Sequence, residues 1–202
     1  MKADFNAEME EILGRGKRLK VLLHSCCAPC SSHCISVLAP HADVTVFYYN
    51  PNIYPQSEYM RRKQEQIRLL DSAFPGVDFI DGDYDVESFY DAVKGYENCP
   101  EGGERCAKCF ELRLAKTAEL ARERGYDCFA TTLTVSPHKN SAVINAIGKG
   151  LAPSLGVDFL PSDFKKKDGY KHSLQLSSLY GLYRQNYCGC EFSRERLKPN
   201  DN

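Results

Sequence analysis

In VLLHSCCAPCSSHCISVL (21–38), a short apolar run passes directly into a segment with helical spacing. We expect a buried strand over 21–25 and then a helix through Val37 and Leu38. Cys26, Cys27 and Cys30 stand where the strand ends and the helix begins. Ligands of open α/β sheets bind at this edge, so the first group of cysteines is a candidate site.

The rest of the chain repeats the order of strand and helix. Further strands are predicted over 44–49, 77–81, 128–135 and 157–161, and helices over about 60–74, 86–96, 105–125 and 141–155. This alternation predicts a three-layer α/β fold with a mainly parallel sheet of about five strands. No linker or repeat divides the chain. We expect one domain over 1–202, with a C-terminal segment from about 164 to 202.

Composition narrows the class of protein. The chain has 202 residues, and its 26 Lys+Arg against 27 Asp+Glu give a net charge of -1, so a nucleic acid would have to meet a local patch. No apolar run is long enough to span a membrane, and the charged N-terminus lacks a signal-peptide pattern. We therefore expect a cytoplasmic protein without a membrane partner. Ten cysteines in that compartment favour metal ligation or redox chemistry over a disulfide scaffold.

Two pairs of cysteines are candidate ligands of one metal centre. Cys26 and Cys27 follow the first strand, and Cys106 and Cys109 open the helix over 105–125. Four thiolates at helix N-termini suit either zinc or an iron–sulfur cluster, and spacing alone leaves both open. Cys30 adds a third possibility, because a lone C-x-x-C pair is also typical of thioredoxin-like proteins. Small buried hydrophobes are the simplest interpretation of Cys34 and Cys128.

A third group, Cys188-Gly189-Cys190, lies near the C-terminus. Two cysteines one residue apart can bridge only through a strained turn, which glycine permits. Strained disulfides are easily reduced, so this pair suits a redox shuttle better than a structural bridge. Two buried or metal-bound thiols are the alternative.

Polar and basic residues could meet a substrate. His138 and Lys139 follow the fourth predicted strand and should reach the same sheet edge as the cysteines. The basic runs Arg61, Arg62, Lys63 and Lys165, Lys166, Lys167 are candidate phosphate contacts, although such runs are more often solvated faces. No glycine-rich phosphate loop occurs after the first strand, so use of ATP is not expected.

Taken together, these segments resemble the cobalamin-independent epoxyqueuosine reductases, the QueH family. The resemblance is carried by HSCCAPC (24–30), FYYNPNIYPQSEYMRRK (47–63), RCAKCFELRLAKTAE (105–119), TTLTVSPHKN (131–140) and YRQNYCGCEFS (183–193). It implies a Rossmann-like fold akin to nucleotide α-hydrolases. It also implies reduction of epoxyqueuosine to queuosine at the wobble position of tRNA with a GUN anticodon, the last step of queuosine synthesis.

The resemblance also implies roles for the cysteines. Cys26, Cys27, Cys106 and Cys109 would hold a four-iron four-sulfur cluster, and Cys188 and Cys190 would form a redox-active disulfide. An additional iron is implied beside the cluster, with Cys30 as its candidate ligand. The reduction consumes two electrons, so an external electron donor is needed. The alternatives are a zinc-stabilised RNA-binding module without reductase activity and a thioredoxin-like disulfide reductase.

Overall fold

The computed structural model of the protein describes residues 3–194. Its sheet has five strands in the order β3-β2-β1-β4-β5, and all neighbours are parallel. The strands are β1 (Leu19–His24), β2 (Ala42–Tyr48), β3 (Asp78–Asp81), β4 (Cys128–Thr131) and β5 (Asp158–Phe159). The predicted α/β fold with a parallel sheet is confirmed.

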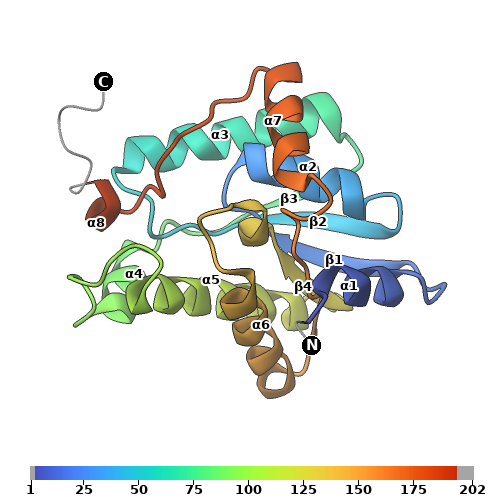
Figure 1. Ribbon diagram of the computed structural model, residues 1–202, viewed down its shortest axis with the longest axis horizontal. Coiled ribbons are helices and arrows are strands. Elements are labelled where there is room, and N and C mark those ends of the chain that lie inside the picture. Colours follow the sequence, from blue (N-terminus) through green and yellow to red (C-terminus); the bar gives the residue numbers. More distant parts are fainter. Residues whose placement is uncertain (1–2, 195–202) are drawn as a thin grey trace.

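Helices cover both faces of the sheet, which makes three layers (Figure 1). The helices α2 and α3 lie on one face with α7 packed on α2, and α5 and α6 lie on the other. The bounds are α1 (Phe5–Leu13), α2 (Ala28–Leu38), α3 (Gln56–Ala73), α4 (Val86–Val93), α5 (Glu104–Glu123), α6 (Ser141–Leu155), α7 (Gly169–Leu179) and α8 (Glu191–Arg194).

The two cores follow from the alternation of side chains along the central strands. Val21 and Leu23 of β1 belong to the core under α2 and α3, whereas Leu22 belongs to the core under α5 and α6. All three side chains are fully buried. A strand of a parallel sheet is covered on both faces, which is why this segment is continuously apolar.

The chain order reverses between β1 and β4. From β1 the chain proceeds outward to β2 and β3, and the later strands β4 and β5 lie on the other side of β1. The loops that follow β1 and β4 therefore meet at the crevice where such folds bind ligands. Cys26 and Thr132 are in contact there, because the Cys26 N–H donates to Thr132 Oγ1 at 3.1 Å.

The fourth strand is shorter than predicted. Residues 128–135 are β-branched and apolar, but β4 ends at Thr131 and a 3₁₀ turn follows over Thr132–Val135. The hydroxyl of Thr131 accepts a hydrogen bond from the Leu133 N–H, which caps that turn. A side chain that bonds to the backbone locally competes with the strand ladder. The fifth strand is also shorter than 157–161.

Three helices were not predicted: α1, α7 and the short α8. The charged N-terminal segment forms α1, which Asp4 caps by accepting from the backbone N–H groups of Asn6 and Ala7. Residues after the lysine run form α7, whose apolar side chains are too few to give a clear period. Residues 195–202 of the expected C-terminal segment lie outside the described residues. No helix within residues 3–194 is both long and apolar enough to cross a bilayer.

Candidate cysteine centre

Three thiols converge at the carboxyl end of β1. The sulfur atoms of Cys26, Cys27 and Cys30 all lie within 4.8 Å of one another. Cys27 is the extended residue that precedes α2, and Pro29 lies in the first helical turn, where its missing N–H costs nothing. The strand end, the helix start and one turn of helix thus place these three thiols together.

The three thiols share a negative charge unequally. Hydrogen bonds from the Cys27 and Cys30 thiols lower the pKa of Cys26 well below its usual value. The same interactions raise the pKa of Cys27 and of Cys30. Cys26 is therefore the thiolate of the group, and thiolates are the form that binds metals.

Two neighbouring cavities contain the remaining predicted cysteines. The first, of about 220 Å³, is lined by Cys26, Cys27 and Cys30. The second, of about 370 Å³, is lined by Cys106 and Cys109 at the start of α5 and by Cys190. Cys188 and Lys139 line both cavities. The structure thus brings all six predicted cysteines to two adjoining cavities, and it groups Cys30 with Cys26 and Cys27.

Cys188 and Cys190 are free thiols of unequal acidity. A hydrogen bond from the Cys190 thiol lowers the pKa of Cys188, and the charges of Lys139 and Arg113 lower it further against the effect of burial. The same hydrogen bond and burial raise the pKa of Cys190. A thiolate beside a protonated thiol is the arrangement that thiol–disulfide exchange uses.

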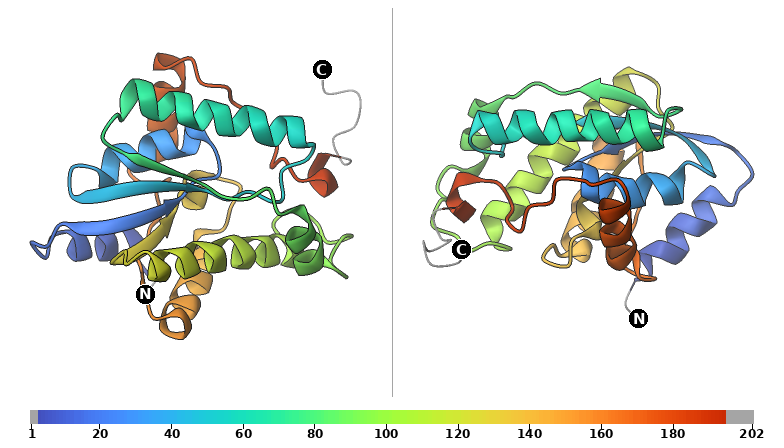
Figure 2. Two further views of the ribbon diagram at one scale, coloured as in Figure 1. Left: turned by 180° about the vertical axis from the view of Figure 1, so that it is seen from behind. Right: turned by 90° about the horizontal axis from the view of Figure 1, so that it is seen from above.

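The Cys188-Gly189-Cys190 loop belongs to an arm that returns from α7 along α3 to α8 (Figure 2). The arm is the segment between α7 and α8, residues 180–190. Arg62 donates from Nη1 to the Cys188 carbonyl at 3.3 Å, and the Tyr54 N–H donates to the Gly189 carbonyl at 2.9 Å. Arg62 is itself buried and paired through Nε with Glu58 at 2.6 Å. These contacts fix the loop backbone beside the cavities.

Arg113 is a buried cation that sequence reasoning missed. It lies one helical turn after Cys109 on α5 and is 2% exposed. Its guanidinium donates to Asn50 Oδ1 at 2.6 Å, to His24 Nε2 at 3.2 Å and towards Cys109 Sγ at 3.9 Å. No carboxylate among the described residues pairs with it. Burial and this charge lower the pKa of His24 to about 3, so the imidazole is neutral.

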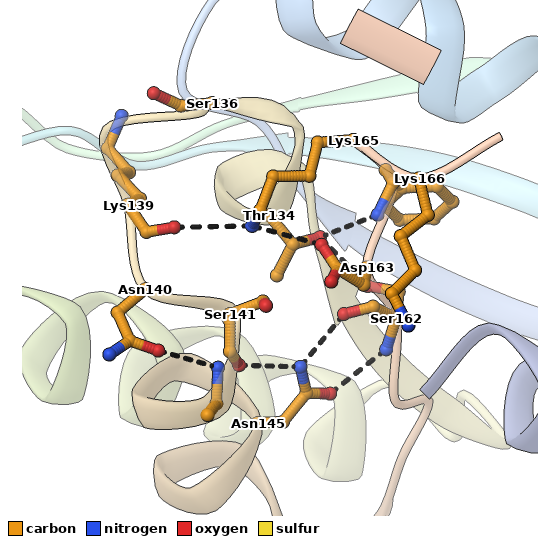
Figure 3. A network of polar contacts seen from close by, with 12 residues as sticks. Thr134, Ser136, Lys139, Asn140, Ser141, Asn145, Ser162, Asp163, Lys165 and Lys166 are labelled. Carbon is orange, nitrogen blue, oxygen red and sulfur yellow. Dashed lines mark hydrogen bonds and ion pairs between the residues drawn. The ribbon is translucent and has the colours of Figure 1, made fainter. Parts of the chain in front are cut away.

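Lys139 is the second cation at the cavities. Burial opposes its charge, but the thiolates of Cys26 and Cys188 raise the pKa of Lys139 to about 12. The backbone of the loop that carries Lys139 is held by Lys165 (Figure 3). Lys165 donates from Nζ to the Lys139 carbonyl at 3.3 Å and pairs with Asp163 at 3.0 Å. Asn145 of α6 joins this network by hydrogen bonds with the Ser162 backbone.

The basic runs are used largely within the fold. Arg62 is buried, and Lys63 pairs with Asp81 at 2.8 Å. Arg61 is exposed, and its guanidinium stacks 3.5 Å from the centre of the Tyr183 ring. Lys166 and Lys167 pair with the N-terminal residues Asp4 and Glu10. His138 is exposed at the mouths of both cavities.

The donor set fits an anionic metal–thiolate group. Thiolate ligands are soft donors that suit iron–sulfur clusters and zinc. A buried guanidinium without a carboxylate is costly unless an anion compensates it. Arg113 is such a buried guanidinium without a paired carboxylate, and it lies beside Cys109. A cluster with thiolate ligands would supply the negative charge that compensates it.

The family model and the similar proteins that match this chain carry the same family name. The family model described as epoxyqueuosine reductase QueH matches residues 21–196. A relative named epoxyqueuosine reductase QueH from Staphylococcus epidermidis is 42% identical over 184 residues, which cover 88% of this chain and 77% of the relative. A relative of the same name from Streptococcus pyogenes serotype M1 is 44% identical over 180 residues, covering 87% and 71%.

Among solved structures, the chain is similar to the U34-tRNA thiolase NcsA from Methanococcus maripaludis, determined with its [4Fe-4S] cluster. The TM-score is 0.58 at 14% sequence identity, and the match covers 94% of this chain and 67% of that one. At this identity the likeness concerns the fold alone, and it agrees with the Rossmann-like arrangement expected from the sequence.

Proposed function

This chain belongs to the epoxyqueuosine reductase QueH family, and from that premise we propose that it reduces epoxyqueuosine at the wobble position of tRNA to queuosine. The substrates would be tRNAs with a GUN anticodon. A tRNA substrate and reduced thiols are both typical of the cytoplasm, where we expect the protein to act.

The observation that carries this proposal is the position of Cys188. It is a thiolate-favouring residue that lines both cavities, the first together with Cys26, Cys27 and Cys30 and the second together with Cys106 and Cys109. A reactive thiolate beside thiols that could hold a metal centre is what a reductase of this kind needs. Nothing comparable is needed for a zinc-stabilised RNA-binding module, and the third thiol beside Cys27 and Cys30 disfavours a thioredoxin-like protein.

The reaction balances with the residues present. An epoxide, two electrons and two protons give an alkene and water. Oxidation of the Cys188 and Cys190 thiols to a disulfide releases two electrons and two protons, which is enough for one turnover. An external electron donor must then reduce the disulfide for the next turnover.

We assign the cofactor to the cysteines as follows. Cys26, Cys27, Cys106 and Cys109 would hold a four-iron four-sulfur cluster, and Cys30 would be a ligand of an additional iron. When bound, these centres supply one-electron transfer and Lewis acidity towards the epoxide oxygen. Arg113 would compensate their negative charge, and Lys139 would hold the Cys188 thiolate.

The tRNA surface is proposed on the exposed basic side chains and the cavity mouth. The exposed Arg61, Lys166 and Lys167 would meet phosphates, with His138 and Lys139 near the reacting nucleotide, whereas Lys63 and Lys165 are half-buried and paired with Asp81 and Asp163. Few phosphate contacts predict a modest dependence of binding on salt. Arg62 is better explained by its contact with the Cys188 carbonyl than by RNA.

Anaerobic purification followed by nucleoside analysis tests the proposal. The protein should be brown, should contain iron and acid-labile sulfide, and should convert epoxyqueuosine in tRNA to queuosine. A colourless protein containing zinc and unable to convert epoxyqueuosine would contradict it.

A further inference from the structure

Two amide oxygens that are buried at the first cavity lack hydrogen-bond partners. Asn52, in the loop between β2 and α3, is 3% exposed, and its Oδ1 accepts no hydrogen bond. Gln185, on the arm, has a buried Oε1 that also accepts none. Both residues line the first cavity, and Asn52 lines the second as well.

Such atoms are uncommon in folded proteins. Buried amide oxygens almost always accept a hydrogen bond, because leaving one unpaired forfeits the bond that it made to water. The neighbouring Asn50 follows this rule, since its Oδ1 accepts from Arg113 and its Nδ2 donates to the Ser25 carbonyl. The unpaired oxygens of Asn52 and Gln185 therefore indicate that a ligand with N–H or O–H donors binds in this cavity.

The chemistry of the wobble base matches two acceptors. Epoxyqueuosine is a 7-deazaguanosine, whose Watson–Crick edge presents the ring N1–H and the exocyclic amino group side by side. Adenine and cytosine present one amino donor beside a ring acceptor, and uracil presents one N–H between two carbonyls. Enzymes that act on a base turned out of the RNA commonly bind it by this edge.

We propose that Asn52 and Gln185 form a nucleobase subsite that accepts the two adjacent donors of a guanine-type Watson–Crick edge. The assignment rests on the function proposed above and adds the means by which the wobble base is recognised. Both amides line the first cavity together with Cys26, Cys27, Cys30 and Cys188, so a base held between them would lie beside these thiols.

Atom-by-atom substitution in the RNA tests the subsite through binding. The probes are two anticodon stem–loop RNAs, one with guanosine and one with inosine at the wobble position, the latter lacking only the exocyclic amino group. Dissociation constants are measured anaerobically for the cofactor-loaded protein and for Asn52→Leu, Gln185→Leu and Asn186→Leu. Asn186 lines the same cavity but is exposed, so it serves as the matched control.

We expect wild type and Asn186→Leu to bind the inosine RNA about tenfold more weakly than the guanosine RNA, the effect of one lost hydrogen bond. Asn52→Leu and Gln185→Leu should each weaken binding of the guanosine RNA by a similar factor. In one of these two variants, the change to inosine should not weaken binding further, because the amide oxygen that accepts from the exocyclic amino group has been removed.

The subsite is refuted if the change from guanosine to inosine weakens binding by both Leu variants as much as it weakens binding by wild type. The amides would then contact the hydroxyls of the 7-substituent or serve only in packing. Gln185 lies on the half-buried arm, so its variant keeps the test open if Asn52→Leu fails to fold. Reduction of epoxyqueuosine in tRNA by the wild-type protein is measured in parallel. If the protein reduces epoxyqueuosine but neither Leu variant changes the effect of inosine, only the subsite is refuted. If a Leu variant abolishes the effect of inosine but the wild-type protein does not reduce epoxyqueuosine, the proposed reductase function is refuted.

Discussion

The guanidinium of Arg62 holds the backbone of Cys188, because Nη1 donates to the Cys188 carbonyl at 3.3 Å. The same guanidinium explains Gly189. A Cβ at position 189 would lie 2.9 Å from Arg62 Nη1 and Nη2, and the φ of +101° is also unfavourable for other residues. The Glu58–Arg62 pair thus holds the Cys188-Gly189-Cys190 loop through its backbone.

Replacing Arg62 should therefore impair the dithiol and spare the cluster. For Arg62→Met we expect turnover to fall by about tenfold or more and disulfide formation between Cys188 and Cys190 to slow, since one donor that fixes the loop is lost. Iron and sulfide content should stay at the wild-type level. Stopped-flow alkylation with mass spectrometry measures the disulfide, and Lys63→Met is the control. Equal effects of both variants would show that Arg62 has no special role.

Ligand substitutions should divide the cysteines into three classes. Alanine at Cys26, Cys27, Cys106 or Cys109 should abolish the visible absorbance of the cluster and most of the iron. Cys30→Ala should lose the additional iron and keep the cluster. Cys34→Ala and Cys128→Ala are matched controls, because both thiols are buried in the core under α2 and α3. The assignment is wrong if all four single variants keep wild-type iron and sulfide.

Lys139 should set the reactivity of Cys188. Its positive charge helps to lower the pKa of Cys188, so the thiolate should be present at neutral pH, where an ordinary thiol is mostly protonated. In Lys139→Met that pKa should rise, and the pH at which iodoacetamide reacts half-maximally with Cys188 should move upward. Lys165→Met is the control, because Lys165 is paired with Asp163 and contacts only the backbone of Lys139. It should leave the pH profile of Cys188 close to that of wild type. An unchanged profile in Lys139→Met would contradict the electrostatic role.

A histidine pair should make stability depend on pH. His33 Nδ1 and His172 Nδ1 lie 3.0 Å apart where α2 meets α7. Burial, and then the charge of His172, lower the pKa of His33 to about 4. The unfolded chain therefore binds the proton more readily, and stability should fall as pH drops from about 6.5 towards 4.

His33 should contribute about 1–3 kcal/mol of this loss, from the size of its pKa shift with an allowance for partial exposure. His24, whose pKa is lowered to about 3, should add a loss that is the same in wild type and in His33→Asn. Urea unfolding of wild type and His33→Asn at several pH values measures the contribution of His33, with exposed His41→Asn as the control. A slope in His33→Asn equal to that of the wild type would show that other groups cause the loss.

The period of the apolar residues was enough to predict the strands and most helices, because a parallel sheet buries its central strands on both faces. It failed where side chains bond locally, as at Thr131, where the strand ends early. The spacing of the cysteines grouped the thiols that the structure places at the two cavities. Spacing could not reveal Arg113, Asn52 or Gln185, because their burial depends on how α5, the loop after β2 and the arm come together. It also could not show that Arg62 in a basic run faces Glu58 and Cys188 and not solvent.

The central claim is that Cys188 and Cys190 give their two electrons to the epoxide. The most direct measurement is a single turnover: the fully reduced protein is freed of reductant, mixed anaerobically with tRNA containing epoxyqueuosine, and quenched with an alkylating agent. We predict one queuosine formed for each Cys188–Cys190 disulfide found by mass spectrometry. Formation of queuosine while both thiols remain free would contradict the account.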